Sequence, residues 1–173
     1  PLSFAEFMTV DDRHPLDAWP DYYTYGGLPH TLSLADEEAK ENYLKELYAK
    51  VYLTDIKERH SIRSDAELKE LMEIIASSIG SPTNPSKLER TFKSVKNVTL
   101  SDKTIDAYLS YFADAFLTEK AIRYDIKGKK YINTLSKHYF TDMGVRNAIL
   151  GFRQTEENHI MENVIYNELR MRG

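Results

Sequence analysis

The feature that most restricts the fold of this chain is the order of patterns between residues 84 and 138. Two helical patterns joined by a turn are followed by two runs with strand character. The helical patterns cover 85–96 and 102–116, and the strand-like runs cover 119–126 and 130–135, hinged at Lys127-Gly128-Lys129. This order predicts a winged helix-turn-helix with a β-hairpin wing, a unit that either binds nucleic acid or serves as a protein-contact module.

Helical periodicity extends over most of the remaining chain. It predicts helices over 33–58, 65–80, 144–150 and 156–172, and a helix that ends at Gly26-Gly27, whereas 11–20 is rich in turn residues. We expect Ser33, Asn84 or Ser86, Ser101, and Thr141 or Asp142 to cap helices. The predicted core positions are Leu44, Leu47, Tyr48 and Val51; Leu68, Leu71, Met72, Ile75, Ala76 and Ile79; Leu88, Phe92 and Val95; and Ile105, Tyr108, Leu109, Phe112 and Phe116.

The fold class predicted from these patterns is mainly α, a helical bundle with a winged helix-turn-helix. We divide the chain into a helical linker or lid region over 1–64, the winged helix-turn-helix over 65–150 and a C-terminal helix over 151–173. The chain begins at Pro1 and stops just after a helical pattern. We therefore expect it to be part of a larger protein.

Charge and composition restrict the class of protein further. The chain has 173 residues, no cysteine and a net charge of −4. Without cysteine there is no disulfide scaffold and no thiolate metal site, which fits a reducing cytoplasm. No apolar run approaches the roughly 20 residues that span a membrane. Residues 1–60 carry twelve acids against six Lys/Arg, whereas 118–138 carry six Lys/Arg against two acids, so a polyanion would contact the hairpin.

The second helix of the pair is poorly suited to reading DNA bases. A recognition helix offers Arg, Lys, Asn or Gln to bases and phosphates. This helix carries Asp102, Asp106 and Asp114 against Lys103 alone. Asp106 would face phosphate repulsion at the centre of the contact, so the sequence argues against base-specific recognition.

The hairpin offers the other nucleic-acid hypothesis. Its basic residues alternate with tyrosines that can stack on bases. The candidate nucleic-acid-binding residues are Lys120, Arg123, Lys127, Lys129, Lys130 and Lys137. The alternative is a solvated two-stranded edge on which lysines prevent edge-to-edge pairing.

Other chemistry receives little support from residue spacing. Gly26-Gly27 could hold a phosphate, but no third glycine and no lysine follow, which favours a structural turn. The five histidines do not have metal-ligand spacing, and the Ser, His and Asp residues suggest no triad. Glu162 and Glu168 are six residues apart and do not form a carboxylate pair on one helix face.

Six segments, in order, resemble a large family of prokaryotic AAA-type ATPases. The segments are PLSFAEF (1–7), YGGLP (25–29), YLKELY…DIKER (43–59), RYDIKGKKY (123–131), YFTDMGVRNA (139–148) and MENVIYNEL (161–169). The resemblance implies an upstream P-loop ATPase domain, a helical and winged-helix middle region, and a downstream restriction-endonuclease-like domain. This chain corresponds to the middle region, and its last helix to the start of the nuclease-like domain.

The resemblance also implies what this chain lacks. No G-x-x-x-x-G-K-[ST] motif is present, so ATP and Mg²⁺ are expected only in the parent protein. Glu162 matches a position that could be a partial active-site acid in the complete protein, but it cannot hold a catalytic metal alone. We expect no enzymatic activity from this chain.

Two functional hypotheses follow. The first is a coupling or protein-interaction module whose partners are the missing ATPase and C-terminal domains or a second subunit. It predicts exposed apolar patches at Leu2, Phe4 and Phe7 and along 161–169. The alternative is a module that binds nucleic acid without sequence preference through the basic hairpin, with DNA as its partner.

Overall fold

The structure, a computed structural model, describes residues 1–62, 65–96, 100–122, 135–153 and 157–172, and it is mainly helical with a small antiparallel sheet. The mainly-α prediction is therefore confirmed. The elements are α1 (Phe4–Phe7), α2 (Pro15–Tyr25), α3 (Pro29–Leu32), α4 (Glu37–Glu46), the π-helical η1 (Leu47–Leu53), α5 (Thr54–Arg59), α6 (Ala66–Ser77), α7 (Pro85–Thr91), η2 (Phe92–Lys96), α8 (Asp102–Asp114), β1 (Thr118–Ile122), β2 (Ser136–Phe140), α9 (Met143–Ile149) and α10 (Glu157–Arg172).

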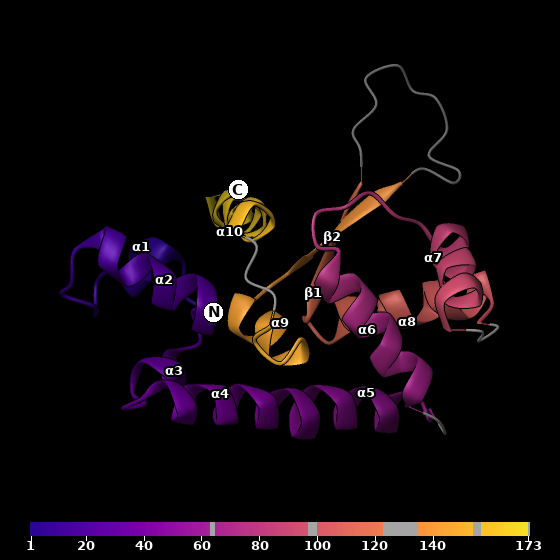
Figure 1. Cartoon of the computed structure of the whole chain (residues 1–173), viewed down its shortest axis with the longest axis horizontal. Helices are drawn as coiled ribbons and strands as arrows, with labels where there is room; N and C mark the ends of the chain where they lie inside the picture. Colours follow the sequence, from indigo (N-terminus) through magenta and orange to yellow (C-terminus); the bar gives the residue numbers. More distant parts are fainter. Residues whose placement is uncertain (63–64, 97–99, 123–134, 154–156, 173) are drawn as a thin grey trace, which may run out of the picture.

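The helices surround α9, which lies near the middle of the molecule (Figure 1). The continuous helical rod of α4, η1 and α5 runs along one side, with α1 and α2 at one end and α6, α7 and α8 at the other. The buried hydrophobic side chains form one cluster that runs from Phe7 to Val164. None of the described helices is long and apolar enough to cross a membrane. The predicted division at residues 64 and 150 stays a prediction.

Helix α9 is the centre of the packing. All seven of its residues are buried. It contacts α2, α4, η1, α6, β2 and α10. A side chain at Gly144 would overlap the backbone carbonyl of Tyr25, so α9 and the end of α2 pack backbone to backbone.

The polar side chains of α9 bond to backbone groups of its neighbours. Arg146 is 3% exposed and donates from Nε to the Ala76 carbonyl of α6 at 2.8 Å. Asn147 is fully buried and donates from Nδ2 to the carbonyls of Tyr23 and Thr24, each at 2.9 Å. These carbonyls lie in the last turns of α6 and α2, where intrahelical partners run out. The buried polar groups therefore fix the relative positions of three helices.

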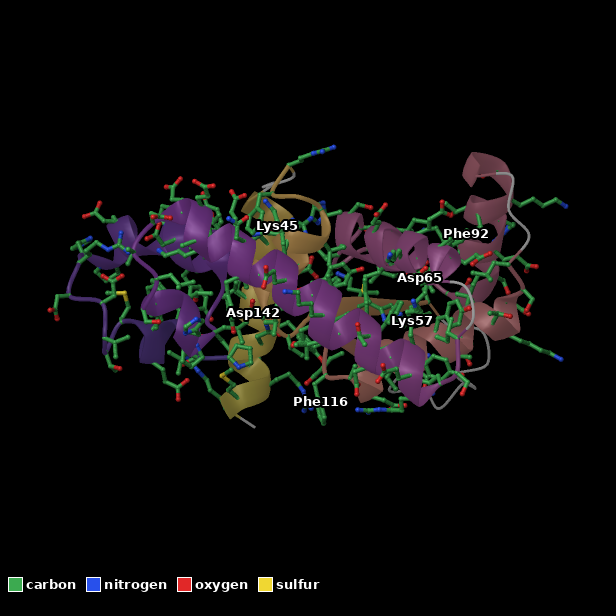
Figure 2. All side chains as sticks on the ribbon, turned by 90° about the horizontal axis from the view of Figure 1, so that it is seen from below. Lys45, Lys57, Asp65, Phe92, Phe116 and Asp142 are labelled. Carbon is green, nitrogen blue, oxygen red and sulfur yellow. The ribbon has the colours of Figure 1, made fainter. Side chains whose placement is uncertain are left out.

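Asp142 caps α9 and also binds the glycine turn after α2. Its Oδ1 accepts from the Val145 amide at 3.0 Å and its Oδ2 accepts from the Gly27 amide at 2.8 Å. A side chain at Gly26, which has φ +77°, would overlap this carboxylate. The Gly26-Gly27 turn thus holds an anion, but the anion belongs to the chain itself, and the structural interpretation of the turn is confirmed. Figure 2 shows Asp142 inside the molecule.

The first 30 residues correct one prediction. The segment 11–20 was expected to be turns, yet α2 begins at Pro15, with His14 as its N-cap. Proline suits the first turn of a helix because the amide it lacks has no intrahelical partner there. The predicted stop at Gly26 is confirmed, since Gly26 is the C-cap of α2.

The long helix starts later than predicted and buries a different face in its second half. Asp36, not Ser33, is the N-cap of α4, with its carboxylate accepting from the Ala39 amide at 2.8 Å. Leu44 is buried as predicted, but Val51 is 51% exposed and Leu53 is buried instead. The π-helical η1 has i→i+5 hydrogen bonds and so turns less per residue than an α-helix, which shifts the buried face.

The helices α6, α7 and α8 follow the predictions closely. All six predicted core residues of α6 are buried, and Asn84 and Ser101 cap α7 and α8 as expected. Leu88, Phe92, Ile105, Leu109 and Phe112 are also buried. Phe116 was wrongly assigned to the core: it follows the end of α8, has φ +55° and is 79% exposed. Figure 2 shows its ring projecting from the molecule.

The ribbon differs from the predicted hairpin in its second strand. β1 overlaps the predicted first strand over 119–122 and begins one residue before it, but its partner β2 spans Ser136–Phe140, not 130–135. The predicted hinge and most of the predicted second strand lie within 123–134, outside the described residues. Of that strand only Leu135 is described, and it is not in β2. No strand was predicted for 136–138, which have no apolar alternation.

The outer edge of β2 is bonded by two other segments, the connection between α6 and α7 and the helix α10. Thr83 and Ser136 exchange two backbone hydrogen bonds of 2.8 Å. Gly80 donates to the His138 carbonyl at 3.4 Å, and Asn163 bonds both backbone groups of Phe140. An unpaired strand edge is a template for aggregation. Here the edge forms hydrogen bonds with a side chain and a loop instead of with a further strand.

We predict that Asp142→Ala destabilises the chain by about 2–4 kcal/mol. The substitution removes a helix cap, worth about 0.5–2 kcal/mol, and leaves the buried Gly27 amide unsatisfied, which costs about 1–3 kcal/mol. The matched control is Asp36→Ala, because Asp36 caps α4 from an exposed position and should cost about 1 kcal/mol. Urea denaturation measures both. Equal losses for the two variants would contradict the role assigned to the Asp142–Gly27 contact.

Candidate interaction site

The candidate site is the junction of α10, the β-ribbon and the N-terminal segment. At its centre the rings of Tyr139 and Tyr166 stack with centroids 4.2 Å apart. The carboxylate of Glu119 on β1 accepts from Tyr166 at 3.1 Å and from Arg170 at 2.9 Å. Because Tyr166 and Arg170 both belong to α10, strand and helix are joined by hydrogen bonds and an ion pair around a stacked pair of rings.

Glu162 of α10 likewise accepts hydrogen bonds from side chains of the ribbon. Its Oε1 accepts from Lys137 Nζ and from Tyr139 OH, each at 2.6 Å. These two contacts lower the pKa of Glu162 below its usual range, with Lys137 as the larger cause. The acid that the family resemblance singled out is therefore bound to the ribbon in this structure. The side chain of Glu162 also approaches the Cα of Gly80, where a Cβ would meet it at 2.9 Å.

Two asparagines of α10 bind the backbone at the end of β2. Asn163 is fully buried; its Oδ1 accepts from the Phe140 amide and its Nδ2 donates to the Phe140 carbonyl, both at 2.7 Å. Asn167 donates to the carbonyls of Phe140 and Thr141 at 2.9 and 3.2 Å. The Asn163 amide presents the same donor and acceptor as a paired strand would. Neither residue was predicted from the sequence; two asparagines at positions i and i+4, which share one face of the helix, were the available signal.

The N-terminal segment closes the other side of the site. The Phe4 amide donates to Glu168 Oε1 of α10 at 2.8 Å. Phe7 is 3% exposed, and Leu2 and Phe4 are partly buried. The prediction that Leu2, Phe4 and Phe7 form an exposed patch is wrong, because the rings of Phe4 and Phe7 pack against α2, at Trp19 and Tyr22.

The outer face of α10 is apolar and exposed. Met161, Ile165 and Leu169 are 44, 52 and 62% exposed. Their spacing of four residues places them on one side of the helix. The predicted patch along 161–169 is therefore confirmed, but Val164 was wrongly placed on it, since Val164 is 5% exposed and faces the core. The helix thus buries Ile160 and Val164 together with Asn163 on its inner face, and it also exposes a stripe of three apolar side chains on its outer face.

The candidate nucleic-acid residues are only partly within the described chain. Arg123, Lys127, Lys129 and Lys130 lie outside it. Lys120 pairs in register with His138, and Lys137 pairs with Ala121, so the two lysines lie on opposite faces of the ribbon. Lys120 is exposed, whereas Lys137 forms an ion pair with Glu162 at 2.6 Å. The described lysines therefore do not form one basic face.

The outward face of α8 has the predicted charge. Asp102, Lys103, Asp106 and Asp114 are all exposed. Tyr111, expected to point outward, instead stacks on His60 at the end of α5, with ring centroids 3.5 Å apart. Part of the helix that would enter a DNA groove is therefore in contact with another helix.

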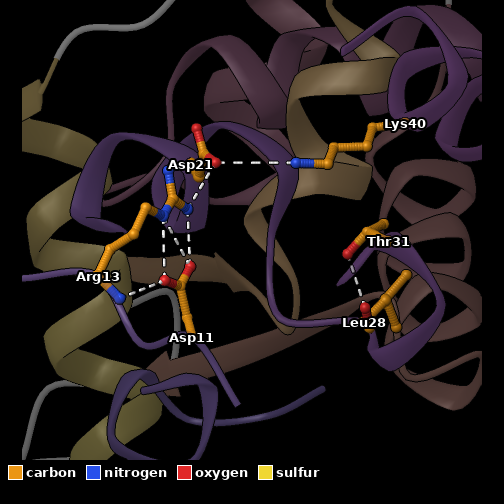
Figure 3. A network of polar contacts seen from close by, with 6 residues as sticks. All are labelled: Asp11, Arg13, Asp21, Leu28, Thr31 and Lys40. Carbon is orange, nitrogen blue, oxygen red and sulfur yellow. Dashed lines mark hydrogen bonds and ion pairs between the residues drawn. The ribbon is translucent and has the colours of Figure 1, made fainter. Parts of the chain in front are cut away.

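A second polar cluster joins the segment after α1 to α2 and α4. The Arg13 guanidinium bonds Asp11 at 2.7 Å and Asp21 at 2.8 Å, and Lys40 lies 3.8 Å from Asp21 (Figure 3). Hydrogen bonding to Arg13 holds the pKa of Asp11 below its usual range. The cluster borders a cavity of about 100 Å³. Two acids and two bases neutralise one another here, so we assign this cluster a structural role.

The remaining candidates for chemistry are the acidic and histidine side chains. Within the described residues, no group of three or more His, Asp or Glu side chains could hold a metal ion. His138 is the one histidine with a strongly altered pKa in this part of the chain. It is 4% exposed and lies 3.3 Å from Ser136 Oγ. Burial, with a smaller effect of Lys120, lowers its pKa to about 4.

These features define a mainly helical domain built around one buried short helix, with a two-stranded ribbon bonded to its last helix. The chain belongs to a domain family of unknown function, DUF8612, whose model matches residues 16–156. It is similar to an uncharacterized protein of Haemophilus influenzae, with 35% identity over all of this chain and 44% of that protein. It is also similar to uncharacterized protein MJ1544 of Methanocaldococcus jannaschii, with 31% identity over all of this chain and 41% of that protein.

The chain thus spans less than half the length of these two relatives. The N-terminal segment and all of α10 lie outside the family model, but both relatives align with them. No solved structure matches the chain.

We predict that His138 makes the chain less stable in acid. Its pKa of about 4 lies below the ordinary 6.5, so the proton binds the unfolded chain more tightly. The stability that neutral His138 contributes is complete above about pH 6.5 and is lost as the pH falls towards 4. The total loss is on the order of 3 kcal/mol. Denaturation at several pH values should show a smaller decline for His138→Gln between pH 6.5 and 4. Identical pH dependence in the two proteins would exclude this role.

Proposed function

We propose that this chain is a non-catalytic coupling or protein-interaction region of winged-helix type from an AAA-type ATPase. The order α6, α7, α8, β1 and β2 agrees with a winged helix-turn-helix. The Thr83–Ser136 bridge supports the assignment because it joins the segment between α6 and α7 to the ribbon. Phe112, Leu117 and Phe140 share the buried cluster, so helix pair and ribbon pack as one unit.

The observation that carries the proposal is the contact between Phe4 and Glu168. It joins residues 164 positions apart in sequence at 2.8 Å. Glu168 lies on α10, which is also bonded to the ribbon through Glu162 and Asn163. A displacement of the N-terminal segment would therefore reach α10 and the ribbon through direct contacts. If an ATPase domain precedes this region, as the family resemblance implies, its motion has a short path to the last helix.

The exposed apolar face of α10 supports a contact role. Isolated apolar side chains on a surface are ordinary, but a stripe of three on one helix face favours an interaction surface. We propose that a further domain of the parent protein or a second subunit covers this stripe. The absence of cysteine supports a reducing compartment, and we include a cytoplasmic location in the proposal.

Nucleic-acid binding receives less support. Exposed acids on α8, the separation of Lys120 from Lys137 and the net charge of −4 all oppose a polyanion. The remaining basic residues of the ribbon keep it as the alternative that experiment must exclude.

We predict that this chain does not bind a short DNA duplex. In a fluorescence anisotropy titration, a labelled duplex should give a flat response at low salt, where contacts to phosphate are strongest. Saturable binding that weakens steeply with salt, and that Lys127→Ala/Lys129→Ala/Lys130→Ala abolishes, would favour the nucleic-acid alternative. Lys50→Ala serves as the control variant, since Lys50 lies on η1, an element that the alternative does not use.

We further predict that the full-length Haemophilus influenzae relative hydrolyses ATP in the presence of Mg²⁺, whereas this chain does not. The chain has no phosphate-binding motif, and the relative contains more than half its length outside the similar region. A phosphate-release assay measures both proteins under the same conditions. Hydrolysis by this chain alone, or none by the relative, would contradict the ATPase part of the proposal.

A further inference from the structure

Residues 1–8, which we call the strap, pack against α2 and the Gly27 turn. The Leu2 amide donates to the Gly27 carbonyl at 2.7 Å, and Tyr22 OH donates to the Leu2 carbonyl at 2.9 Å. The rings of Phe4 and Phe7 pack on Trp19 and Tyr22 of α2. The strap has its own local order, since Ser3 and Glu6 form a reciprocal capping box at the start of α1.

The strap contacts two different elements. On one side it lies against the Gly27 turn, where a Cβ would overlap the Leu2 carbonyl. On the other side its Phe4 amide is bonded to Glu168 of α10. Leu2, which approaches Gly27 closely, and Phe4, which bonds Glu168, are only two residues apart. The strap cannot move away from Gly27 as a unit without also weakening its contact with α10.

Helix α10 is attached mainly through polar contacts. Ile160 and Val164 are its buried hydrophobic residues within the described chain. Its other inward contacts are the stack of Tyr166 on Tyr139 and the hydrogen bonds and ion pairs of Glu162, Asn163, Tyr166, Asn167, Glu168 and Arg170. A helix held in this way opens more readily than the central α9, which is buried on all sides.

We propose that docking of the strap and docking of α10 are thermodynamically coupled, so that release of either one loosens the other while the rest of the fold stays closed. The biological use of this coupling rests on the proposed function, whereas the coupling itself is a property of this chain. Coupling between two sites is reciprocal and typically changes an equilibrium by about 5- to 150-fold. Both relatives align with the strap and with α10, as the coupling requires.

Gly27→Ala tests the coupling from the strap side. The added methyl group must displace the Leu2 carbonyl, and Gly27 has no positive φ that would add backbone strain. Trp19 is the single tryptophan of the chain and its ring lies 5.2 Å from that of Phe4, so acrylamide quenching of its fluorescence reports strap docking. We expect stronger quenching together with about 5- to 150-fold faster hydrogen exchange in α10. Exchange in α6 and α9 should be unchanged.

Asn163→Ala tests the coupling from the other side. It removes the two hydrogen bonds of Asn163 to Phe140 without touching the strap. Reciprocity requires that Trp19 become more accessible to acrylamide. Leu88→Ala is the control, because Leu88 is buried in α7 and contributes to stability away from both elements. Leu88→Ala should accelerate hydrogen exchange only through global unfolding.

The results that overturn the proposal are distinct. Unchanged Trp19 quenching in Gly27→Ala shows that the strap does not detach, and unchanged α10 exchange beside increased quenching shows that the two are not coupled. Acceleration of α6 and α9 to the same extent as α10 shows a single global transition. Failure here leaves the proposed contact role intact, since that role is tested by DNA titration and ATP hydrolysis.

Discussion

The fold depends on burying α9 with its polar groups satisfied. Asp142, Arg146 and Asn147 would each be costly in the interior without partners. Their partners are backbone groups of Gly27, Ala76, Tyr23 and Thr24, so two helix ends and one turn are positioned by the same short segment. Burial raises the pKa of Asp142 in spite of its hydrogen bonds to backbone amides. The surrounding helices, the ribbon and α10 are arranged around this segment.

The periphery is held differently from the centre. Apolar burial dominates around α6 and α8, where the amphipathic faces are regular. At the junction of α10, the ribbon and the strap, much of this apolar burial is replaced by ion pairs and by hydrogen bonds of tyrosine hydroxyls and asparagine amides. Polar contacts near the surface compete with water and contribute little each. The chain therefore combines a firm centre with a last helix that can respond to contacts at its other end, which is what a coupling region needs.

The candidate site was only partly predictable. The exposed stripe of α10 followed from helical spacing, because Met161, Ile165 and Leu169 recur every four residues. Which side of α10 faces inward did not follow, since Asn163 turns inward to complete the backbone of β2. Likewise Leu2, Phe4 and Phe7 were expected to need a partner outside the chain. Periodicity within eight residues carries no information about the complementary surface that α2 presents.

The sequence by itself determined the local elements: the cap at Ser101, the caps of α7 and α9 to within two candidate residues each, the stop at Gly26 and the buried stripe of α6. These depend on residues within about one or two helical turns, so their signals are complete in a short window. The tertiary structure decided which segment pairs with β1, which carboxylate occupies the Gly26-Gly27 turn, and that the N-terminal segment meets α10. Two of those contacts join residues more than a hundred positions apart. They form because polar groups must find partners when they are buried, and burial depends on the packing of the whole molecule and not on any single segment.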